Sequence, residues 1–461
     1  MATPKVDAIT AQIARWAAEL RFEDLDDNAV HTAKRCLLDA FGCALGGYGQ
    51  EDVRIALSVL DEIAGPGTAT VIGIGKQVDP VSAAFANALM VRVMDYNDIY
   101  WQQDPCHPSD LIPAAIACGE RQQRDGRDLI VAIVLGYEFA MRLCESAFPG
   151  IRDRGWHHAT FTSIAAPIAA AKMLGLQWKQ IQHAVGISAS RHVAAGAVTA
   201  GELSMMKNTA DPLATQSGVL AALLAERGYT GPSGVIDGKE GLVHCFGPEW
   251  KLDALVEDLG KSWRIEQISF KAFPTEALTH APLTAVLDLM RDHDLIHDRI
   301  EHVRVRTLTW AADILADRAK YDPRTKETAD HSLPYVIAAA LVDQEVTPAQ
   351  FETGRIMDPT IRAQLNKVEV IADPDYDNQF PQRQQTEVTI KTTDGRILSR
   401  QLQYPKGDPR SPLTDEEIKA KFDTLAAPVL TSAGSKELKT MIWQLEKLGA
   451  IAPLMQLCRA A

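Results

Sequence analysis

The chain has 461 residues, of which 46% are hydrophobic and 23% are charged, and its formal net charge is −13 at pH 7. This length exceeds the usual size of a single hydrophobic core, so we expect two domains. The acidic balance, without any Lys/Arg-rich run, argues against a nucleic-acid partner, because phosphate binding needs a basic field. A small anionic ligand is compatible with this charge, since a local pocket of Arg, Lys and His can hold one.

Seven cysteines are scattered along the chain and none forms a CxxC pair. An odd, dispersed set favours reduced thiols in a cytoplasmic compartment and contains no zinc signature. The first twenty residues form an amphipathic helical pattern that includes Asp7, unlike the unbroken apolar core of a signal peptide. Because no apolar stretch reaches the roughly 18–20 residues that span a bilayer, we expect a cytoplasmic protein without a membrane partner.

From residue 9 to about residue 259 the pattern is almost entirely helical. Apolar side chains recur at helical spacing near residues 13–20 and 33–45, and Gly46 and Gly47 end the second helix. Alanine-rich segments predict further helices at residues 81–91, 112–119, 129–144, 160–174, 181–189 and 212–227. Because small side chains let helices approach closely, these segments favour a compact bundle. A short β-like exception, TATVIGIG, begins at residue 68.

The character of the sequence changes near Trp263. The pattern predicts strands at residues 265–270, 300–308, 368–372, 387–392 and 396–403. Helices predicted at 281–290 and 332–342 alternate with these strands, which indicates an α+β domain. After a Pro/Gly-rich linker, Thr414 begins helices that we expect to return to the first domain. The predicted fold is therefore mainly α, with a large all-helical domain at 1–264, an inserted smaller α+β lid domain at 265–408, and C-terminal helices at 409–461.

The stretch from Asp95 to Asp110, DYNDIYWQQDPCHPSD, concentrates polar chemistry directly after an apolar run. It contains four aspartates, one histidine (His107) and two prolines. An aspartate can orient or hold charge, while an imidazole, which titrates near neutrality, takes or gives a proton. The alternative interpretation is a solvated loop with an Asx turn and an incidental histidine.

Three further segments could contribute to a site. GWHHAT places His157 and His158 at the start of an apolar helix, where backbone N–H groups favour anions, although a histidine there is often only a cap. Lys207 follows a Met pair and is either a snorkelling side chain or a charge held for an anionic ligand. KAFPTEALTH, which runs from Lys271 to His280, is either a polar turn before a helix or a part of the site.

The chain carries no GxGxxG, Walker, HExxH, GxSxG or cysteine-cluster motif. We therefore expect no metal, no nucleotide or other cofactor, and no acyl-enzyme nucleophile. The remaining Asp, His and Lys residues suit acid–base work on a small anionic carboxylate. Such work begins with loss of a proton α to a carboxylate and ends with loss of water, loss of CO₂ or reprotonation.

Five segments together resemble the MmgE/PrpD family: DYNDIYWQQDPCHPSD, GWHHATFTSIAAPIAAAKMLGL, AERGYTGP, KAFPTEALTH and ETADHSLPYVIAAAL. They occur in the family's order over essentially the whole chain. The family contains 2-methylcitrate dehydratases, cis-aconitate decarboxylases and an iminodisuccinate epimerase. The resemblance implies a homodimer whose subunits have a large helical domain, an inserted α+β lid and an active site in the cleft between them.

The resemblance also implies roles for individual residues. The catalytic residues that it implies are Asp95, His107, His157, Lys207 and His280. The substrate-binding residues that it implies are His158, Lys271 and Tyr321. Lys271 matches a lysine that recurs in the family's lid motif, where its role could also be structural.

Several positions beside the proposed site depart from the family pattern. Ile99 stands where the DxxDT motif has threonine, which removes a hydroxyl that could contact substrate. Cys106 replaces a common alanine, and Leu111 stands where the dehydratase branch often has asparagine. The sequence MKNTADP around Lys207 also differs from the dehydratase-like MWKGCA. These changes bear on the substrate more than on the fold.

The sequence thus predicts a cofactor-independent hydro-lyase that dehydrates a small branched tricarboxylate, with 2-methylcitrate as the first candidate. The DYNDxY…HPSD and ADHSLPY forms favour the dehydratase branch of the family over the decarboxylase branch. The alternatives are an isomerase, epimerase or decarboxylase acting on a related acid, and a catalytically silent protein that binds a carboxylate. The sequence does not assign which histidine is the acid and which is the base.

Overall fold

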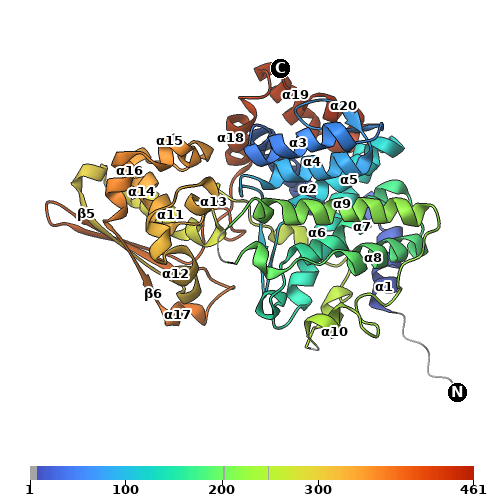
Figure 1. Ribbon diagram of the computed structural model, residues 1–461, viewed down its shortest axis with the longest axis horizontal. Coiled ribbons are helices and arrows are strands. Elements are labelled where there is room, and N and C mark those ends of the chain that lie inside the picture. The colour runs from blue at the N-terminus through green and yellow to red at the C-terminus, as the bar shows by residue number, and fades with distance from the viewer. Residues whose placement is uncertain (1–7, 201–202, 248) are drawn as a thin grey trace. The chain divides into compact units, whose positions relative to one another are not determined.

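The computed structural model describes residues 8–200, 203–247 and 249–461, so Asp7 lies outside the described residues. Contacts divide the chain into two compact units (Figure 1). The first contains Met1–Val93, Asn97–Ile268 and Thr414–Ala461, and the second contains Met94–Tyr96 and Ser269–Leu413. The second unit is therefore an insertion in the chain of the first, and the tripeptide around Asp95 belongs to it.

The first unit is built from helices. They are α1 (Ile9–Glu19), α2 (Asp27–Gly47), α3 (Glu51–Ile63), α4 (Pro80–Arg92), α5 (Ile112–Gln122), α6 (Gly126–Ser146), α7 (Ala159–Leu174), α8 (Trp178–Arg191), α9 (Met206–Glu226), α10 (Leu242–Phe246), α18 (Asp415–Ala426), α19 (Ser432–Trp443) and α20 (Ala452–Gln456). Its strands form two short antiparallel pairs, β1 (Ala69–Thr70) with β2 (Gln77–Val78), and β3 (Tyr100–Trp101) with β4 (Pro105–Cys106). The C-terminal helix α18 packs on α2, so both ends of the chain contribute to this unit.

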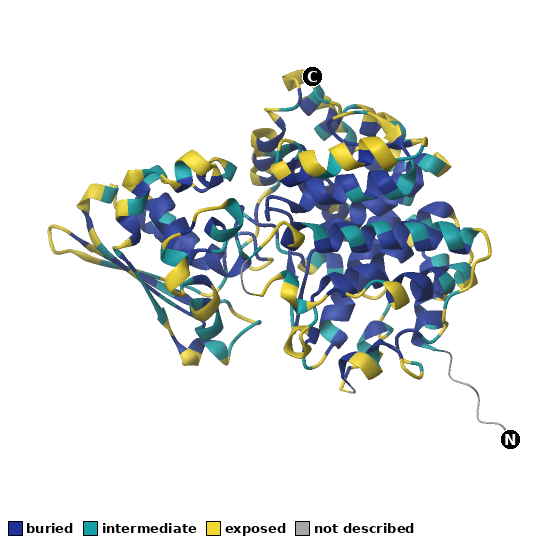
Figure 2. Cartoon of the chain, viewed as in Figure 1, coloured by how far each residue is buried: buried dark blue, intermediate teal, exposed yellow. Residues whose placement is uncertain are grey.

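Helices α7 and α9 pack on each other in the mostly buried interior of the first unit (Figure 2). Their backbones approach closely because α9 has a glycine at Gly218, where a Cβ atom would lie 2.6 Å from the Ala166 Cβ. The predicted start of α9 at Pro212 is wrong, since the helix begins at Met206 and contains this proline. Proline removes one helical hydrogen bond, but buried packing on both sides of it sustains the helix. Lys207 consequently lies in the first turn of α9.

The second unit combines a sheet with helices. Its strands are β5 (Ile300–Thr307), β6 (Val368–Ala372), β7 (Thr386–Thr392) and β8 (Ile397–Leu402), and its helices are α11 (His280–Asp292), α12 (Thr309–Leu315), α13 (Lys326–Ala329), α14 (Leu333–Asp343), α15 (Thr353–Ile356), α16 (Pro359–Leu365) and α17 (Pro374–Asp377). The strand order is β6-β5-β7-β8; β5 and β6 are parallel and the other pairs are antiparallel. Helix α11 packs on β7, β8 and α14, and α14 packs on β6. The alternating burial along β7 reflects this one-sided cover.

The structure confirms the mainly α fold class, and four of the predicted strands correspond to β5, β6, β7 and β8. The strand predicted at residues 265–270 is wrong, because Arg264–Gln267 form a 3₁₀ turn. Ile265 and Ile268 are both buried, and their spacing of three residues fits one face of such a turn. Among the described residues, no helix has both the length and the apolar character that crossing a membrane requires.

Candidate active site

The stretch from Asp95 to Asp110 is largely buried, so the interpretation as a solvated loop is wrong. Asp95 is 3% exposed, and Asp98, Asp104 and Asp110 are fully buried. The hairpin of β3 and β4 closes the middle of the stretch, and a 3₁₀ turn at Pro108–Leu111 follows it. A buried carboxylate is costly unless it is hydrogen-bonded, so each aspartate needs its own partners.

Asp98 organises the turn that carries His107. Its Oδ1 accepts hydrogen bonds from the backbone N–H (3.2 Å) and the hydroxyl (2.7 Å) of Ser109, and its Oδ2 accepts one from the Tyr137 hydroxyl at 2.5 Å. Burial raises the pKa of Asp98 to about 6, although these donors oppose the shift. The carboxyl of Asp98 is therefore committed to the protein, and we assign it a positioning role.

Two other aspartates are also structural. The carboxylate of Asp104 accepts backbone N–H groups of Ile151 (2.7 Å) and Arg152 (3.1 Å), which fixes the segment before the GWHHAT motif. Asp110 accepts a hydrogen bond from the Asn97 side-chain amide at 3.1 Å. These contacts explain why the stretch contains more carboxylates than the chemistry requires.

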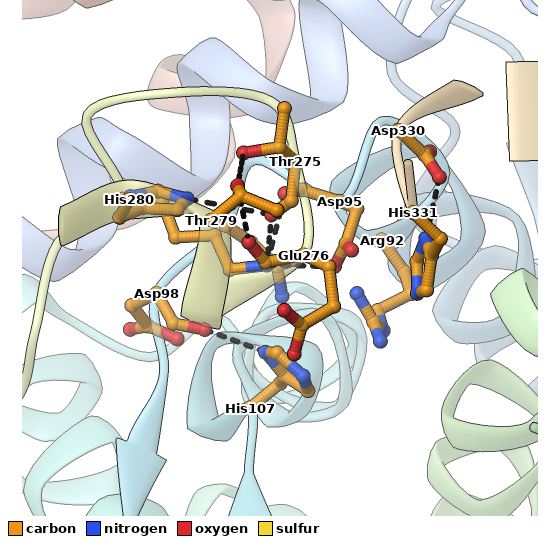
Figure 3. Close-up of polar contacts among 12 residues, drawn as sticks. Arg92, Asp95, Asp98, His107, Thr275, Glu276, Thr279, His280, Asp330 and His331 are labelled. Atoms are coloured by element: carbon orange, nitrogen blue, oxygen red, sulfur yellow. Dashed lines mark hydrogen bonds and ion pairs between the residues drawn. The ribbon is translucent and has the colours of Figure 1, made fainter. Parts of the chain in front are cut away.

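The partner of His107 fixes how its ring is protonated. His107 Nδ1 lies 2.7 Å from the backbone carbonyl oxygen of Asp98 (Figure 3). A carbonyl oxygen only accepts, so Nδ1 carries a proton and the neutral ring has its lone pair at Nε2. His107 is 4% exposed, and its ring centroid lies 5.3 Å from that of His158. The geometry thus suits His107 to act as a base through Nε2.

His157 has the opposite arrangement. Its Nδ1 accepts the backbone N–H of Ala159 at 3.2 Å, so the neutral ring carries its proton on Nε2. Burial, reinforced by the charges of His158 and Arg92, holds the pKa of His157 well below its ordinary value. The Nε2 atom is buried and has no hydrogen-bond partner among the described residues. His157 is therefore a neutral donor that can serve an oxygen atom of a ligand.

His158 lies between the other two histidines and beside Asp211. Its ring centroid is 3.9 Å from that of His157, and its Nε2 lies 3.3 Å from Asp211 Oδ2. Burial alone would raise the pKa of Asp211, but the charge of His158 and its hydrogen bond hold that pKa well below its usual range. Asp211 also accepts a hydrogen bond from the Thr162 hydroxyl at 2.6 Å, which ties α9 to α7.

His157, His158 and Asp211 offer three donor atoms that lie within 4.8 Å of one another, as a metal site would require. The tautomer of His157 argues against coordination. Its Nδ1 lone pair is used by the Ala159 N–H and its Nε2 carries the proton, so a metal ligand would need that backbone bond to break. We therefore treat this cluster as a hydrogen-bonding site.

Two buried cations belong to the first unit. Lys207 is 2% exposed in the first turn of α9, and Arg92 is 3% exposed at the end of α4. The Arg92 guanidinium lies 3.8 Å from the Asp110 carboxylate, and its charge lowers the pKa values of His157 and Asp211. Arg92 was missed in the sequence, where it reads as the end of an apolar helix. A lone arginine three residues before Asp95 was the available signal.

Lys271 and Asp95 are joined in the second unit. Lys271 Nζ donates to Asp95 Oδ1 (2.8 Å), the Asp95 carbonyl (3.0 Å) and the Thr275 carbonyl (3.0 Å). Asp95 has a φ of 50°, which is unusual for a residue other than glycine. These bonds from one ammonium group hold this strained backbone. Lys271 is thereby suited to position Asp95, and its substrate contact stays a prediction.

His280 and Tyr321 also lie in the second unit. His280 is 3% exposed; its Nε2 lies 3.4 Å from the Thr275 carbonyl and its ring packs against Phe273 at a centroid distance of 5.4 Å. His280 therefore shares Thr275 as a partner with Lys271. The Tyr321 hydroxyl instead donates to the carbonyl of Val368 in β6 at 3.2 Å. Its predicted substrate contact stays a prediction.

The helical unit interrupted by an α+β unit agrees with the matches to known families. The MmgE/PrpD N-terminal domain matches residues 11–254, and the MmgE/PrpD C-terminal domain matches residues 273–447. The chain belongs to the MmgE/PrpD family.

Relatives with two different activities match most of the chain. The chain is 27% identical to a cis-aconitate decarboxylase of Aspergillus terreus over 97% of this chain and 95% of the relative, and 27% identical to human cis-aconitate decarboxylase over 96% and 92%. It is 26% identical to the 2-methylcitrate dehydratase of Escherichia coli over 85% of this chain and 84% of the relative. The family thus covers both elimination of water and loss of CO₂.

Proposed function

We propose that the protein is a cofactor-independent lyase that dehydrates a small branched tricarboxylate, with 2-methylcitrate as the first candidate. The pair of complementary histidines in the first unit carries this proposal. His107 presents a lone pair at Nε2, and His157 presents an N–H at Nε2. An elimination needs both functions, because a base must remove a proton while a donor stabilises the negative charge that develops.

The proposed reaction has two chemical parts. His107 Nε2 takes the proton α to a carboxylate, and the electron pair moves onto that carboxylate to give an enediolate. The His157 N–H and the buried Lys207 cation stabilise this charge, and Arg92 adds a second cation for substrate carboxylates. The C–O bond then breaks, and an acid protonates the departing hydroxyl to give water. The sequence names His280 as a candidate for that acid.

Decarboxylation of a related acid such as cis-aconitate is the second candidate. The matches to cis-aconitate decarboxylases extend over 96–98% of this chain, whereas those to 2-methylcitrate dehydratases extend over 85–88%. In this reaction a C–C bond breaks, CO₂ leaves, and the electron pair left behind takes a proton. His107 would then act as an acid in its doubly protonated form.

An ultraviolet assay with a panel of citrate-like acids tests both candidates. Dehydration creates a conjugated double bond, so absorbance rises without CO₂ release, whereas decarboxylation releases CO₂. We expect the rise with one 2-methylcitrate isomer in the absence of added metal or nucleotide. Replacing the proposed base, as in His107→Ala, should lower kcat by about 10²–10⁴-fold and leave the far-ultraviolet circular dichroism unchanged. A flat trace and no CO₂ across the panel would refute both candidates.

The resemblance also supports a cytoplasmic homodimer, which we propose as the assembly of the enzyme. Light scattering coupled to size exclusion tests it directly. We expect a mass twice that of the chain, and a monomeric mass at micromolar concentration would contradict the proposal.

A further inference from the structure

The segment ETADHSLPY, which helped to identify the family, contains a histidine–aspartate pair that the proposed reaction does not use. His331 Nδ1 lies 2.6 Å from Asp330 Oδ1 (Figure 3). The carboxylate of Asp330 is fully buried, whereas the His331 side chain is 15% exposed. A carboxylate that accepts the Nδ1 proton orients an imidazole and stabilises its protonated form, as in catalytic triads.

Several contacts hold Asp330 in place. Its Oδ2 lies 3.3 Å from Lys326 Nζ, and its backbone carbonyl accepts the N–H of Glu276 at 3.0 Å. Ser332 follows immediately and caps helix α14 by accepting the N–H of Tyr335. The pair is thus anchored on both sides, by the loop that leads to His280 and by the start of a buried helix.

The pair shares its electrostatic environment with Asp95. Burial would lower the pKa of Lys326, but the charges of Asp330, Glu327 and Asp95 outweigh it and raise that pKa. One lysine therefore interacts with both Asp330 and Asp95, which places the pair in the same group of residues as Lys271. Two other histidines of this unit differ: His280 is directed at the Thr275 carbonyl, and the partly exposed His302 of β5 lies 3.5 Å from Glu369.

We propose that His331, oriented by Asp330, is a further proton-transfer residue of this enzyme and supplies the acid for the leaving hydroxyl. The inference rests on the proposed function and completes it. The Nε2 proton of the imidazolium moves to the hydroxyl oxygen as the C–O bond breaks with its electron pair on oxygen, so water leaves and a neutral ring remains. Solvent then returns the proton, which the partial exposure of the side chain permits.

Chemical rescue tests this role in the full-length protein. The variant His331→Ala should lose about 10²–10⁴-fold in kcat with KM within a few-fold, and added imidazole should restore part of the loss. The variant Asp330→Asn should also lose kcat, but imidazole should not rescue it, because the ring is still present. His302→Ala is the matched control and should retain wild-type turnover. Because an acid must be protonated to act, the alkaline limb of the kcat–pH profile should report His331 in the wild type.

Two outcomes would overturn the inference. If the wild type turns over substrate and His331→Ala keeps its kcat and pH profile, His331 is not a proton-transfer residue. If the wild type is inactive on every acid, the proposed function fails. The ¹⁵N spectra of labelled histidine then test whether a carboxylate ligand contacts His331. The His331 Nε2 resonance is assigned as the one that disappears in His331→Gln. Binding of tricarballylate should shift this resonance. A resonance that does not move would refute contact between His331 and a carboxylate ligand.

Discussion

At the scale of single residues, hydrogen-bond partners separate the histidines that the sequence leaves equivalent. A backbone carbonyl beside Nδ1 puts the lone pair of neutral His107 at Nε2, and a backbone N–H beside Nδ1 puts the proton of neutral His157 at Nε2. The hydrogen-bond partner of Nδ1 therefore decides which tautomer each histidine adopts. A local sequence motif does not reveal this partner. His107 finds its partner nine residues earlier in the chain.

Asp98 should make the stability of the protein depend on pH. Its pKa is raised from 3.8 to about 6 by burial, so the native state holds a proton that the unfolded state releases. The free energy of unfolding should therefore fall as pH rises from about 4 to 6, by up to about 3 kcal/mol from this group. The variant Asp98→Asn should lose this part of the slope in urea unfolding. Identical slopes in variant and wild type would contradict the shift.

Glu120 provides an internal control for that measurement. Burial raises its pKa to about 6 as well, although it accepts hydrogen bonds from the backbone N–H and hydroxyl of Thr70. Because the pKa of Glu120 is raised like that of Asp98, its contribution to the free energy of unfolding also falls between pH 4 and 6. Glu120→Gln should remove this contribution. This residue lies in α5, is hydrogen-bonded to Thr70 and has no part in the proposed reaction, so turnover should be preserved.

Removing Lys271 should damage stability and activity together. The variant Lys271→Met leaves the buried Asp95 carboxylate without its ammonium partner, which costs about 3–5 kcal/mol in comparable buried pairs. Asp95 also loses the bonds that hold its φ of 50°. Guanidinium unfolding and kcat measure the two effects. The control Lys391→Met removes an exposed pair with Glu301 and should change stability by less than about 0.5 kcal/mol.

The sequence proposed candidate residues, and the structure adds the burial and the hydrogen-bond partners of each. Asp95, His107, His157 and Lys207 are all buried, as residues of a site in the interior would be. The resemblance implies that Lys271 binds substrate or has a structural role, and its three hydrogen bonds to backbone and carboxylate oxygens of the protein suit the structural role. The sequence could not reveal this, because two of those acceptors are backbone carbonyls whose positions depend on the fold.

At the scale of elements, the close contact of α7 and α9 positions the histidine cluster. His158 immediately precedes α7, and α9 carries its partner Asp211. The variant Gly218→Ala adds a methyl group 2.6 Å from the Ala166 Cβ and 2.8 Å from the Pro167 nitrogen, so the helices must separate. We expect a loss of about 1–3 kcal/mol in the free energy of unfolding and a fall in kcat.

Gly354 is the matched control for that substitution. It also lies in a helix, α15, but an added Cβ would meet no atom within 4 Å among the described residues. Gly354→Ala should therefore be neutral or stabilise the protein by up to about 1 kcal/mol, because alanine favours the helix. Equal effects of the two substitutions would show that the α7–α9 contact has space for a methyl group.

Helices and strands whose apolar residues repeat at a regular spacing were predictable from the sequence. Elements that depend on tertiary contacts were not. The strand at Val368–Ala372 was predicted with its observed bounds, since its apolar residues and flanking turns are local signals. Pro212 misled the prediction of α9 because proline usually starts a helix, whereas buried packing carries α9 through it. Residues 264–267 were misjudged because buried isoleucines suggested a strand.

At the scale of the whole molecule, the order of motifs along the chain predicted the family, while the assignment of Met94–Tyr96 to the second unit was not predictable. The pattern before Asp95 is a continuous apolar helix that belongs to the first unit. The tripeptide joins the second unit through the Lys271 bonds and through the Tyr96 hydroxyl, which donates to the Ala272 carbonyl at 3.0 Å. Contacts over such sequence distances leave no local pattern.

The net charge of −13 should slow the capture of an anionic substrate at low salt. Raising ionic strength from about 10 to 150 mM shortens the Debye length from about 30 to 8 Å, so long-range repulsion weakens while buried cations such as Lys207 stay effective. We expect kcat/KM to rise severalfold with kcat unchanged. Replacing the exposed Glu19 and Glu62 with lysine should flatten this response. A fall of kcat/KM with salt would mean instead that local positive charge dominates the approach of the substrate.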